Sequence, residues 1–312
     1  MNDIHTQPET SSGEPLVRKS KVIDVEAAVA HVRNGMTVAI GGFINSSHPM
    51  FIVRELIRKG LRDLTIVGAA SSGLELDLLI AAGVAKRVVS PYIGAEGLAA
   101  IGPAYRAAVE RGLLEVFELD EAMFYAGLRA AAQRVPFNPW RSGLGTSFPQ
   151  INPAIKVFTD PCNGEQLLAI PAVNIDVAFL HAAVSDIYGN VQYIGHAYGD
   201  RAIYAAADLT FVQVEQIVSN EEIRRDPLRT AVPGADGVIR ARFGSHPYAS
   251  PGHYVEDREH IKEYVRAATA WAKDGDRASL EIYLQKWIHG PKDGLEYLER
   301  VGLRTLLSLN EY

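Results

Sequence analysis

The stretch Asn34 to Phe43, NGMTVAIGGF, decides the fold that this 312-residue chain is expected to adopt. An Asn-Gly turn precedes an apolar run that ends in Gly41-Gly42, and short apolar runs bounded by glycine are typical of buried strands. A double glycine at the end of a strand lets a ligand approach the backbone closely and exposes N–H groups. The alternative is an ordinary glycine turn between a strand and a helix.

The same kind of apolar run recurs along the chain, with helix-length stretches between several of the runs. Alternation of strand and helix predicts an α/β protein with an open, mostly parallel sheet and helices on both faces. Ligands of such folds bind at the carboxyl ends of the strands. The further strand candidates are residues 63–70, 86–93, 113–119, 167–173, 176–184 and 208–218, and the helix candidates between them include 49–60, 74–83, 103–112 and 121–134.

The two ends of the chain differ from this pattern. Residues 1–20 are polar and have no apolar core of a signal peptide, so they predict a flexible leader before one domain over residues 21–312. The Pro/Gly/Asn-rich residues 149–164 predict a long surface loop. From Asp257 onward the apolar spacing is helical, which predicts a helical C-terminal layer.

Composition excludes several function classes. The net charge is −6, and no run of Lys or Arg is long enough to follow a row of phosphates, so a nucleic acid partner is not expected. No apolar window reaches the ~20 residues of a membrane helix. Cys162 is the only cysteine, which excludes an internal disulfide and fits a cytoplasmic location. His181, His196 and His246 lack metal-ligand spacing and are expected to be structural, so no metal is predicted.

The stretch 34–43, followed by Pro49, resembles the signature of family I CoA-transferases, although Ser47 stands where that signature usually has glycine. The similarity covers the chain from about residue 21 onward. It includes the apolar runs and turns at 63–68, 83–88 and 176–190. Residues 218–227 and 244–247 are especially similar to the α subunits of glutaconate CoA-transferases.

The resemblance implies the CoA-transferase (NagB/RpiA-like) fold and a partner that is a homologous β subunit, in an α2β2 or α4β4 assembly with the active site near the interface. A coenzyme A thioester is then a substrate, with no cofactor, and CoA moves between a dicarboxylic or 3-oxo acid and an acceptor acid. Family members use a glutamate nucleophile, which two-subunit enzymes carry on the β chain. Gly41 and Gly42 would lie at the thioester, with Phe43 and Asn45 binding substrate.

One position departs from the transferase pattern. Family transferases usually have glutamine where this chain has Glu121, and a carboxylate there could act as a general base if burial raised its pKa. The alternative is that Asp120 and Glu121 begin a helix, where acidic residues are favoured. The neighbouring sequence also resembles the α subunits of ring-cleaving CoA-thioester hydrolases of steroid catabolism, on the basis of residues 130–137, 139, 141, 143–147 and 149–150.

Three hypotheses therefore remain open: transferase subunit, ring-opening hydrolase subunit with Glu121 as base, and non-catalytic binding subunit. Four further residues are weaker candidates for substrate binding. Arg134 and Arg141 flank a Pro-rich segment and could bind a carboxylate, or form surface ion pairs. Ser71 and Ser72 follow the second strand candidate and could supply hydrogen-bond donors, or form a simple turn.

Overall fold

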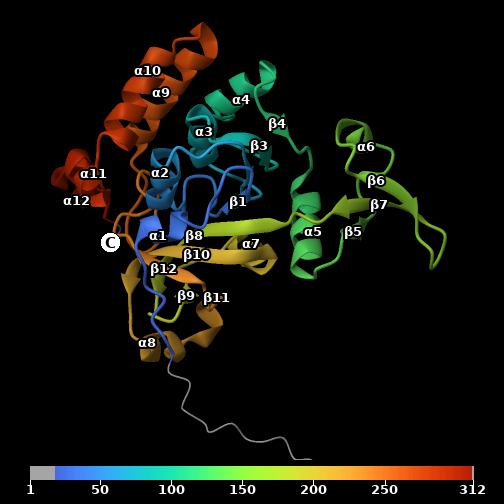
Figure 1. Cartoon of the computed structure of the whole chain (residues 1–312), viewed down its shortest axis with the longest axis horizontal. Helices are drawn as coiled ribbons and strands as arrows, with labels where there is room; N and C mark the ends of the chain where they lie inside the picture. The colour runs from blue at the N-terminus through green and yellow to red at the C-terminus, as the bar shows by residue number, and fades with distance from the viewer. Residues whose placement is uncertain (1–17, 311–312) are drawn as a thin grey trace, which may run out of the picture.

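The computed structural model describes residues 18–310, so most of the predicted leader lies outside the described residues (Figure 1). Within that range nine strands form one sheet in the order β11-β9-β8-β1-β2-β3-β4, with β10 beside β8 and β12 beside β10. The pairs of β1 with β2 and β8, of β8 with β10, and of β2 with β3 are all parallel. The predicted mostly parallel sheet is confirmed. Its strands are β1 (Thr37–Ile40), β2 (Leu64–Val67), β3 (Ala85–Val89), β4 (Glu115–Val116), β8 (Ile175–Ser185), β9 (Asn190–Gln192), β10 (Ala207–Ile217), β11 (Thr230–Pro233) and β12 (Gly237–Arg240).

Helices cover both faces of this sheet, because successive side chains of each strand point to opposite sides. In β1, Val38 and Ile40 enter one core and Ala39 enters the other. The second core is covered by α5 (Glu121–Ala132) and α7 (Asp200–Ala206). Helices that contribute buried residues to the first core are α1 (Val25–Val29), α2 (Met50–Arg58), α3 (Leu74–Ala81), α4 (Pro103–Glu110), α9 (Arg258–Asp274), α10 (Arg277–Leu284), the π-helix η2 (Gln285–His289) and α11 (Gly294–Val301).

The helical C-terminal layer predicted from residue 257 onward is present. It comprises α9 to α11 and ends with α12 (Leu303–Ser308), and α9 packs against α4 on the outside of the first core (Figure 1). Two short helices, α8 (Asn220–Arg225) and the 3-10 helix η1 (Pro227–Arg229), connect β10 to β11. No helix within residues 18–310 combines the length and apolarity needed to cross a membrane.

A separate antiparallel sheet corrects two sequence-based expectations. It consists of β5 (Phe137–Trp140), β6 (Lys156–Thr159) and β7 (Gln166–Pro171) in the order β5-β7-β6, and it projects to one side of α5 (Figure 1). The apolar run at 167–173 is therefore not a strand of the main sheet. The predicted loop 149–164 is interrupted by the end of α6 (Phe148–Ile151) and by β6, because Lys156–Thr159 find a partner in β7.

Candidate active site

The glycine pair Gly41-Gly42 lies directly after β1, at the sheet edge where the parallel strands end. Gly42 has φ +111°, and a Cβ there would lie 2.4 Å from Nδ1 of His48. A Cβ on Gly41 would lie 2.6 Å from Oδ1 of Asp200. Contacts below 3.0 Å cannot be accommodated without moving the neighbour, and this φ is unfavourable for any L residue. Both positions therefore require glycine.

The N–H groups of this loop are not free, which corrects the expectation that the glycine pair exposes them. The N–H of Gly41 donates to the carbonyl oxygen of Phe179 at 2.9 Å, and that of Gly42 donates to Oδ1 of Asp200 at 3.1 Å. Phe43 N–H donates to Ser46 within the turn. What the pair offers a ligand is a backbone without side chains rather than a set of unpaired donors.

The buried side chain of His48 contacts the backbone of this loop at two points. The ring nitrogens of His48 lie 3.0 Å from the carbonyl oxygen of Gly41 and 2.9 Å from that of Ile44. Nε2 also lies 3.3 Å from Oε2 of Glu75, and Oε1 of Glu75 accepts the N–H of Gly73 at 3.1 Å. The His48–Glu75 pair thus connects the loop after β1 to the loop after β2.

Both side chains of the His48–Glu75 pair are completely buried, which favours their uncharged forms. Burial lowers the pKa of His48 to about 4 and raises the pKa of Glu75 to about 8. Neither charged form recovers its lost hydration at this position. The 3.3 Å contact is therefore expected to join an imidazole and a carboxylic acid in their uncharged forms.

Asp200 supports the glycine pair from the other face of the sheet. It is the first residue of α7 and is 1% exposed. Its Oδ2 accepts the hydroxyl of Tyr193 at 2.8 Å while its Oδ1 accepts the N–H of Gly42. Burial raises the pKa of Asp200 to about 7. The loop is consequently fixed by hydrogen bonds to two side chains, Asp200 and His48.

The remaining residues predicted in this loop region have different roles. The hydroxyl of Ser72 is buried 3.0 Å from that of Ser90, so the prediction that it faces a ligand is wrong. The carbonyl oxygen of Ser71 accepts the N–H of Ile44, which fastens the two loops together. Oδ1 of Asn45 is buried without a hydrogen-bond partner among the described residues, so Asn45 keeps an acceptor available.

Phe43 contacts Tyr198, a residue that lines a neighbouring pocket. Its ring stacks on that of Tyr198, with centroids 4.5 Å apart and planes 3° from parallel. The pocket beside Tyr198 has a volume of about 460 Å³ and is lined by His196, Arg201 and Arg229 among others. His196 is exposed here, so its expected structural role is wrong, whereas His181 and His246 are buried and hydrogen-bonded as expected.

Glu121 lies at the same edge of the sheet as the glycine pair. It begins α5, and the preceding Asp120 caps that helix by accepting the N–H of Met123 at 2.7 Å. Burial raises the pKa of Tyr125 in the next turn of α5, and the charges of Glu121 and Asp200 raise it further. Glu121 itself is exposed in this chain, so burial that would make it a base has to come from a partner or a substrate.

The two candidate arginines are not brought to this edge. Nη1 of Arg134 donates to Oδ1 of Asp208 at 2.8 Å, near the amino end of β10 and therefore at the opposite edge of the sheet. Arg141 makes a bidentate pair with Glu165, at 2.5 Å and 2.7 Å, beside the antiparallel sheet. Both arginines form surface ion pairs, which was the alternative to substrate binding.

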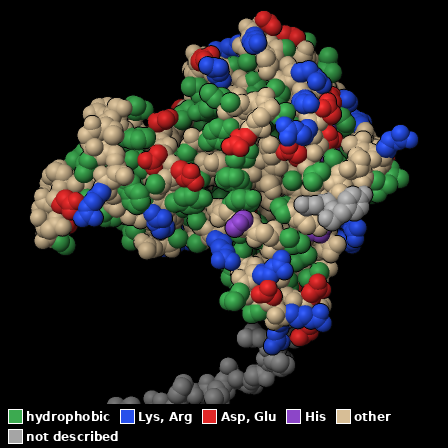
Figure 2. All heavy atoms as spheres, turned by 180° about the vertical axis from the view of Figure 1, so that it is seen from behind, with side chains coloured by type: hydrophobic (Ala, Val, Ile, Leu, Met, Phe, Trp, Pro, Cys, Tyr) green, Lys and Arg blue, Asp and Glu red, His purple; other side chains and the backbone are tan. Residues whose placement is uncertain are grey.

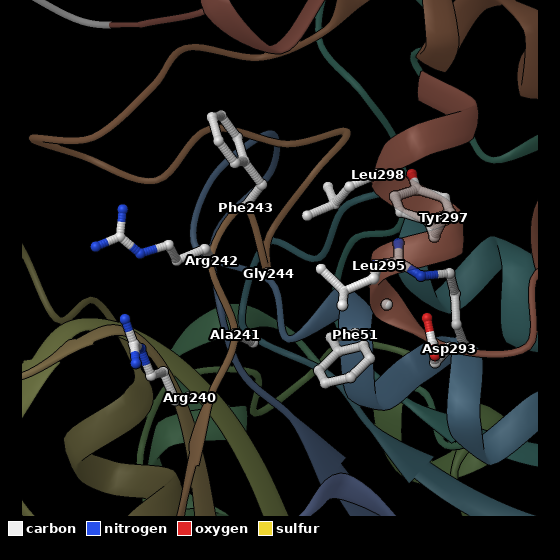
Figure 3. Close-up of a pocket in the computed structure, with 12 residues that line it drawn as sticks. Phe51, Arg240, Ala241, Arg242, Phe243, Gly244, Asp293, Leu295, Tyr297 and Leu298 are labelled. Carbon is white, nitrogen blue, oxygen red and sulfur yellow. The ribbon is translucent and has the colours of Figure 1, made fainter. Parts of the chain in front are cut away.

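A second pocket of about 420 Å³ lies between α11 and the residues that follow β12 (Figure 3). Figure 3 shows Phe51, Leu295 and Leu298 around it, whereas the guanidinium groups of Arg240 and Arg242 point away from these apolar side chains. The pocket suits an apolar group.

One cluster among the described residues has the composition of a metal site. Ligand atoms of His246, Asp257 and His260 lie within 4.8 Å of one another. These groups already bond to each other and to tyrosine hydroxyls, for example Nδ1 of His246 to Tyr297 at 2.8 Å. Arg54 donates to the carbonyl oxygen of His246, and its positive charge opposes a cation at this position. The cluster is a buried hydrogen-bond network.

Comparison with known families identifies the protein family to which this chain belongs. The family model described as Coenzyme A transferase matches residues 22–236, which contain the glycine pair, Glu121 and Asp200. This chain belongs to the coenzyme A transferase family. The CoA-transferase fold that the signature implied is confirmed, and the chain is an enzyme subunit of that family.

Three relatives show how this family member compares with others. A glutaconate CoA-transferase subunit of Acidaminococcus fermentans is 32% identical over 93% of this chain and 94% of its own length, and the crystal structure of that enzyme matches with a TM-score of 0.86 over 94% of this chain and 96% of that one. The cholesterol ring-cleaving hydrolase IpdA subunit of Mycobacterium tuberculosis is 33% identical over 87% of this chain and 93% of its own. An uncharacterised protein of Archaeoglobus fulgidus is 37% identical over 90% of this chain, which spans 62% of that relative's length.

Proposed function

We propose that this chain is the α subunit of a heteromeric acyl-CoA:carboxylate CoA-transferase that moves CoA between a dicarboxylic or 3-oxo acid and an acceptor acid. The observation that carries the proposal is the Gly41-Gly42 loop. Asp200 and His48 hold it rigidly at the carboxyl edge of the sheet, where it presents bare backbone to a ligand. Such a surface suits a thioester that must lie close to the chain while a nucleophile reaches it.

The nucleophile in this proposal is a glutamate of the β subunit. Its carboxylate attacks the thioester carbonyl carbon, and the carbon–sulfur bond breaks to give a mixed anhydride and CoA thiolate. The thiolate then attacks the glutamyl carbonyl carbon, which forms a glutamyl-CoA thioester and releases the first acid as its carboxylate. The acceptor acid reverses these two steps, so no water, cofactor or metal is consumed.

Assembly with a homologous β subunit, in an α2β2 or α4β4 complex in the cytoplasm, is part of the same proposal. Two relatives are named as subunits, and Glu121 is exposed at the edge that carries the glycine loop. Co-expression with the partner followed by exchange of labelled CoA among dicarboxylates and 3-oxo acids tests the reaction. Exchange in ping-pong kinetics is the expected result. Absence of exchange across that panel would contradict transfer, and a non-catalytic binding role would then be the remaining interpretation.

Glu121 motivates a second candidate function, hydrolysis of a ring in a cyclic diketone CoA thioester. Its place at the edge of the glycine loop, and the similarity to the IpdA subunit, both favour this candidate. In the hydrolase, the Glu121 carboxylate would take a proton from water as the water oxygen attacks a ring carbonyl carbon. The adjacent carbon–carbon bond would then break, its electron pair would form the enolate of the second ketone, and that enolate carbon would take the proton back from Glu121 to leave a carboxylic acid and a ketone.

Substitution of Glu121 by glutamine distinguishes the two functions. We expect Glu121→Gln to keep CoA transfer within about threefold of the natural rate, because a glutamine keeps the shape of the side chain and no step of transfer uses it as a base. Steady-state exchange rates of the full complex test this. A loss of about a hundredfold or more, with assembly intact, would favour the hydrolase. Glu221→Gln, at an exposed helix position, is the matched control.

A further inference from the structure

The pocket beside Tyr198 contains two arginines that form no ion pair with any acid among residues 18–310. Arg201 lies in the first turn of α7 and Arg229 at the end of η1, and both line the same pocket of about 460 Å³ together with His196. We refer to it as the arginine pocket. Tyr193, Gly195, Ala197, Tyr198, Leu228 and Ala231 complete its lining.

Neither arginine has an acidic partner in the part of the chain that the structure describes. Arg134 and Arg141 each find a carboxylate, and acidic and basic side chains are interspersed over the face seen in Figure 2. Within residues 18–310, by contrast, the side chain of Arg201 makes no hydrogen bond or ion pair, and the side chain of Arg229 donates only to the carbonyl oxygen of Tyr193, at 3.3 Å. Two guanidinium groups in one pocket repel each other unless an anion lies between them. The charge pattern therefore points to an anionic ligand.

The arginine pocket adjoins the glycine loop by two routes. Tyr198, which lines the pocket, stacks on Phe43, the residue after the glycine pair. Arg201 directly follows Asp200, whose carboxylate accepts the N–H of Gly42. An anion in the pocket would consequently lie beside the loop on which the proposed thioester is placed.

We propose that the arginine pocket binds the second carboxylate of a dicarboxylic acid, either in the acyl group or in the acceptor, and so selects dicarboxylic over monocarboxylic substrates. This inference rests on the proposed transfer function and names its substrate class. Guanidinium groups match the planar carboxylate and bind it through paired N–H donors. The ring of Tyr198, which stacks on Phe43, provides an apolar surface for the carbon chain between the two carboxylates.

Phosphate groups of coenzyme A share this anion chemistry. The whole pantetheine arm separates them from the sulfur, however, whereas the pocket borders the loop at which the thioester lies. The geometry therefore favours a carboxylate of the acid over a phosphate of CoA. Acetyl-CoA and its 3′-dephospho form distinguish the two sources, because only the phosphate alternative predicts a different response to these donors.

The test compares Arg201→Gln and Arg229→Gln with the natural complex, using glutarate and pentanoate as acceptors that differ by one carboxylate. Each variant is expected to lower kcat/KM for glutarate about tenfold and to change that for pentanoate less than about threefold, because one charge-assisted hydrogen bond is lost. Arg224→Gln, an exposed arginine paired with Glu221 outside the pocket, is the control that should match the natural complex with both acids.

Three outcomes would overturn the inference. Equal losses for glutarate and pentanoate would mean that the arginines act on structure, and unchanged rates for both would mean that the pocket is not used. A higher KM for acetyl-CoA but not for its dephospho form would assign the pocket to a phosphate. Calorimetry of glutarate binding to the full complex tests the pocket even if no acid is a substrate, and weaker binding is expected in Arg201→Gln. Failure of this inference can therefore be distinguished from failure of the transfer proposal.

Discussion

Gly42→Ala is expected to lower CoA transfer about a hundredfold or more while the complex still assembles. The added Cβ would lie 2.4 Å from Nδ1 of His48 and 2.8 Å from the carbonyl oxygen of Ser47, and φ of +111° would remain strained even if those atoms moved. His48 cannot retreat, because its other ring nitrogen contacts Ile44 and Glu75. The loop itself must therefore shift, and displacement of a reacting group by about 1 Å can cost a hundredfold in rate.

Gly35→Ala is the matched control for this substitution. Gly35 precedes the same strand and also has positive φ, +84°, yet no other atom lies within 4 Å of the position of its Cβ. We expect Gly35→Ala to lose about 1 kcal/mol of stability and to keep transfer within a few-fold. Steady-state rates of both complexes, with chromatography to confirm assembly, provide the measurement. Similar losses in the two variants would show that backbone strain, not the shape of the loop, limits the reaction.

Local sequence patterns predicted the strands and the turns between them, because apolar spacing and glycine positions determine those elements locally. The run Thr37–Ile40 ends in glycines because its side chains enter two cores and the chain must then leave the sheet at a position without room for a Cβ. An apolar run does not indicate, however, with which other strands it will pair. The residues of β7 form a strand as predicted, but pairing with β5 and β6 rather than with the parallel strands depends on tertiary contacts.

The candidate site was predicted only in part, because its supports come from distant segments. Asp200 lies 158 residues from Gly42 along the chain, and no local spacing indicates that contact. His48 lies outside the stretch 34–43 and was not predicted as a support of the loop, and Glu75 has the position of an ordinary first-turn acid of α3. Arg134 illustrates the opposite error. A motif-rich neighbourhood indicated substrate binding, but α5 runs from the site at Glu121 to the opposite edge of the sheet.

The free energy of unfolding of the full-length chain is expected to fall as pH rises from about 6.5 to about 8, and Glu75 is the main cause. Its pKa is raised from 4.5 in the exposed state to about 8 by burial. Between these values the unfolded chain has released a proton that the folded chain retains, so stability falls as pH increases, by about 1.4 kcal/mol per pH unit for one group. The expected contribution of Glu75 across this window is about 2 kcal/mol.

The window is chosen so that His48 does not mask the effect. Because burial lowers its pKa from 6.5 to about 4, His48 makes stability rise with pH mainly between those values, and this opposing slope fades in the lower part of the window. It is the same in the natural chain and in a Glu75 variant. Asp200 and Glu215, whose pKa values burial raises to about 7, add to the fall in the lower part of the window. These two groups remain in a Glu75 variant, so the difference between variant and natural chain isolates Glu75.

Urea unfolding of Glu75→Gln and of the natural chain at the two ends of this pH window measures that difference. Glutamine keeps the oxygen that accepts the N–H of Gly73 and has no proton to release, so the variant should lose about 2 kcal/mol less than the natural chain across the window. Glu221→Gln, at an exposed position of α8, should follow the natural chain. An equal fall in Glu75→Gln would mean that Glu75 is already ionised when folded. His48 would then be its protonated partner, and the loop after β1 would be held by an ion pair instead of by two neutral groups.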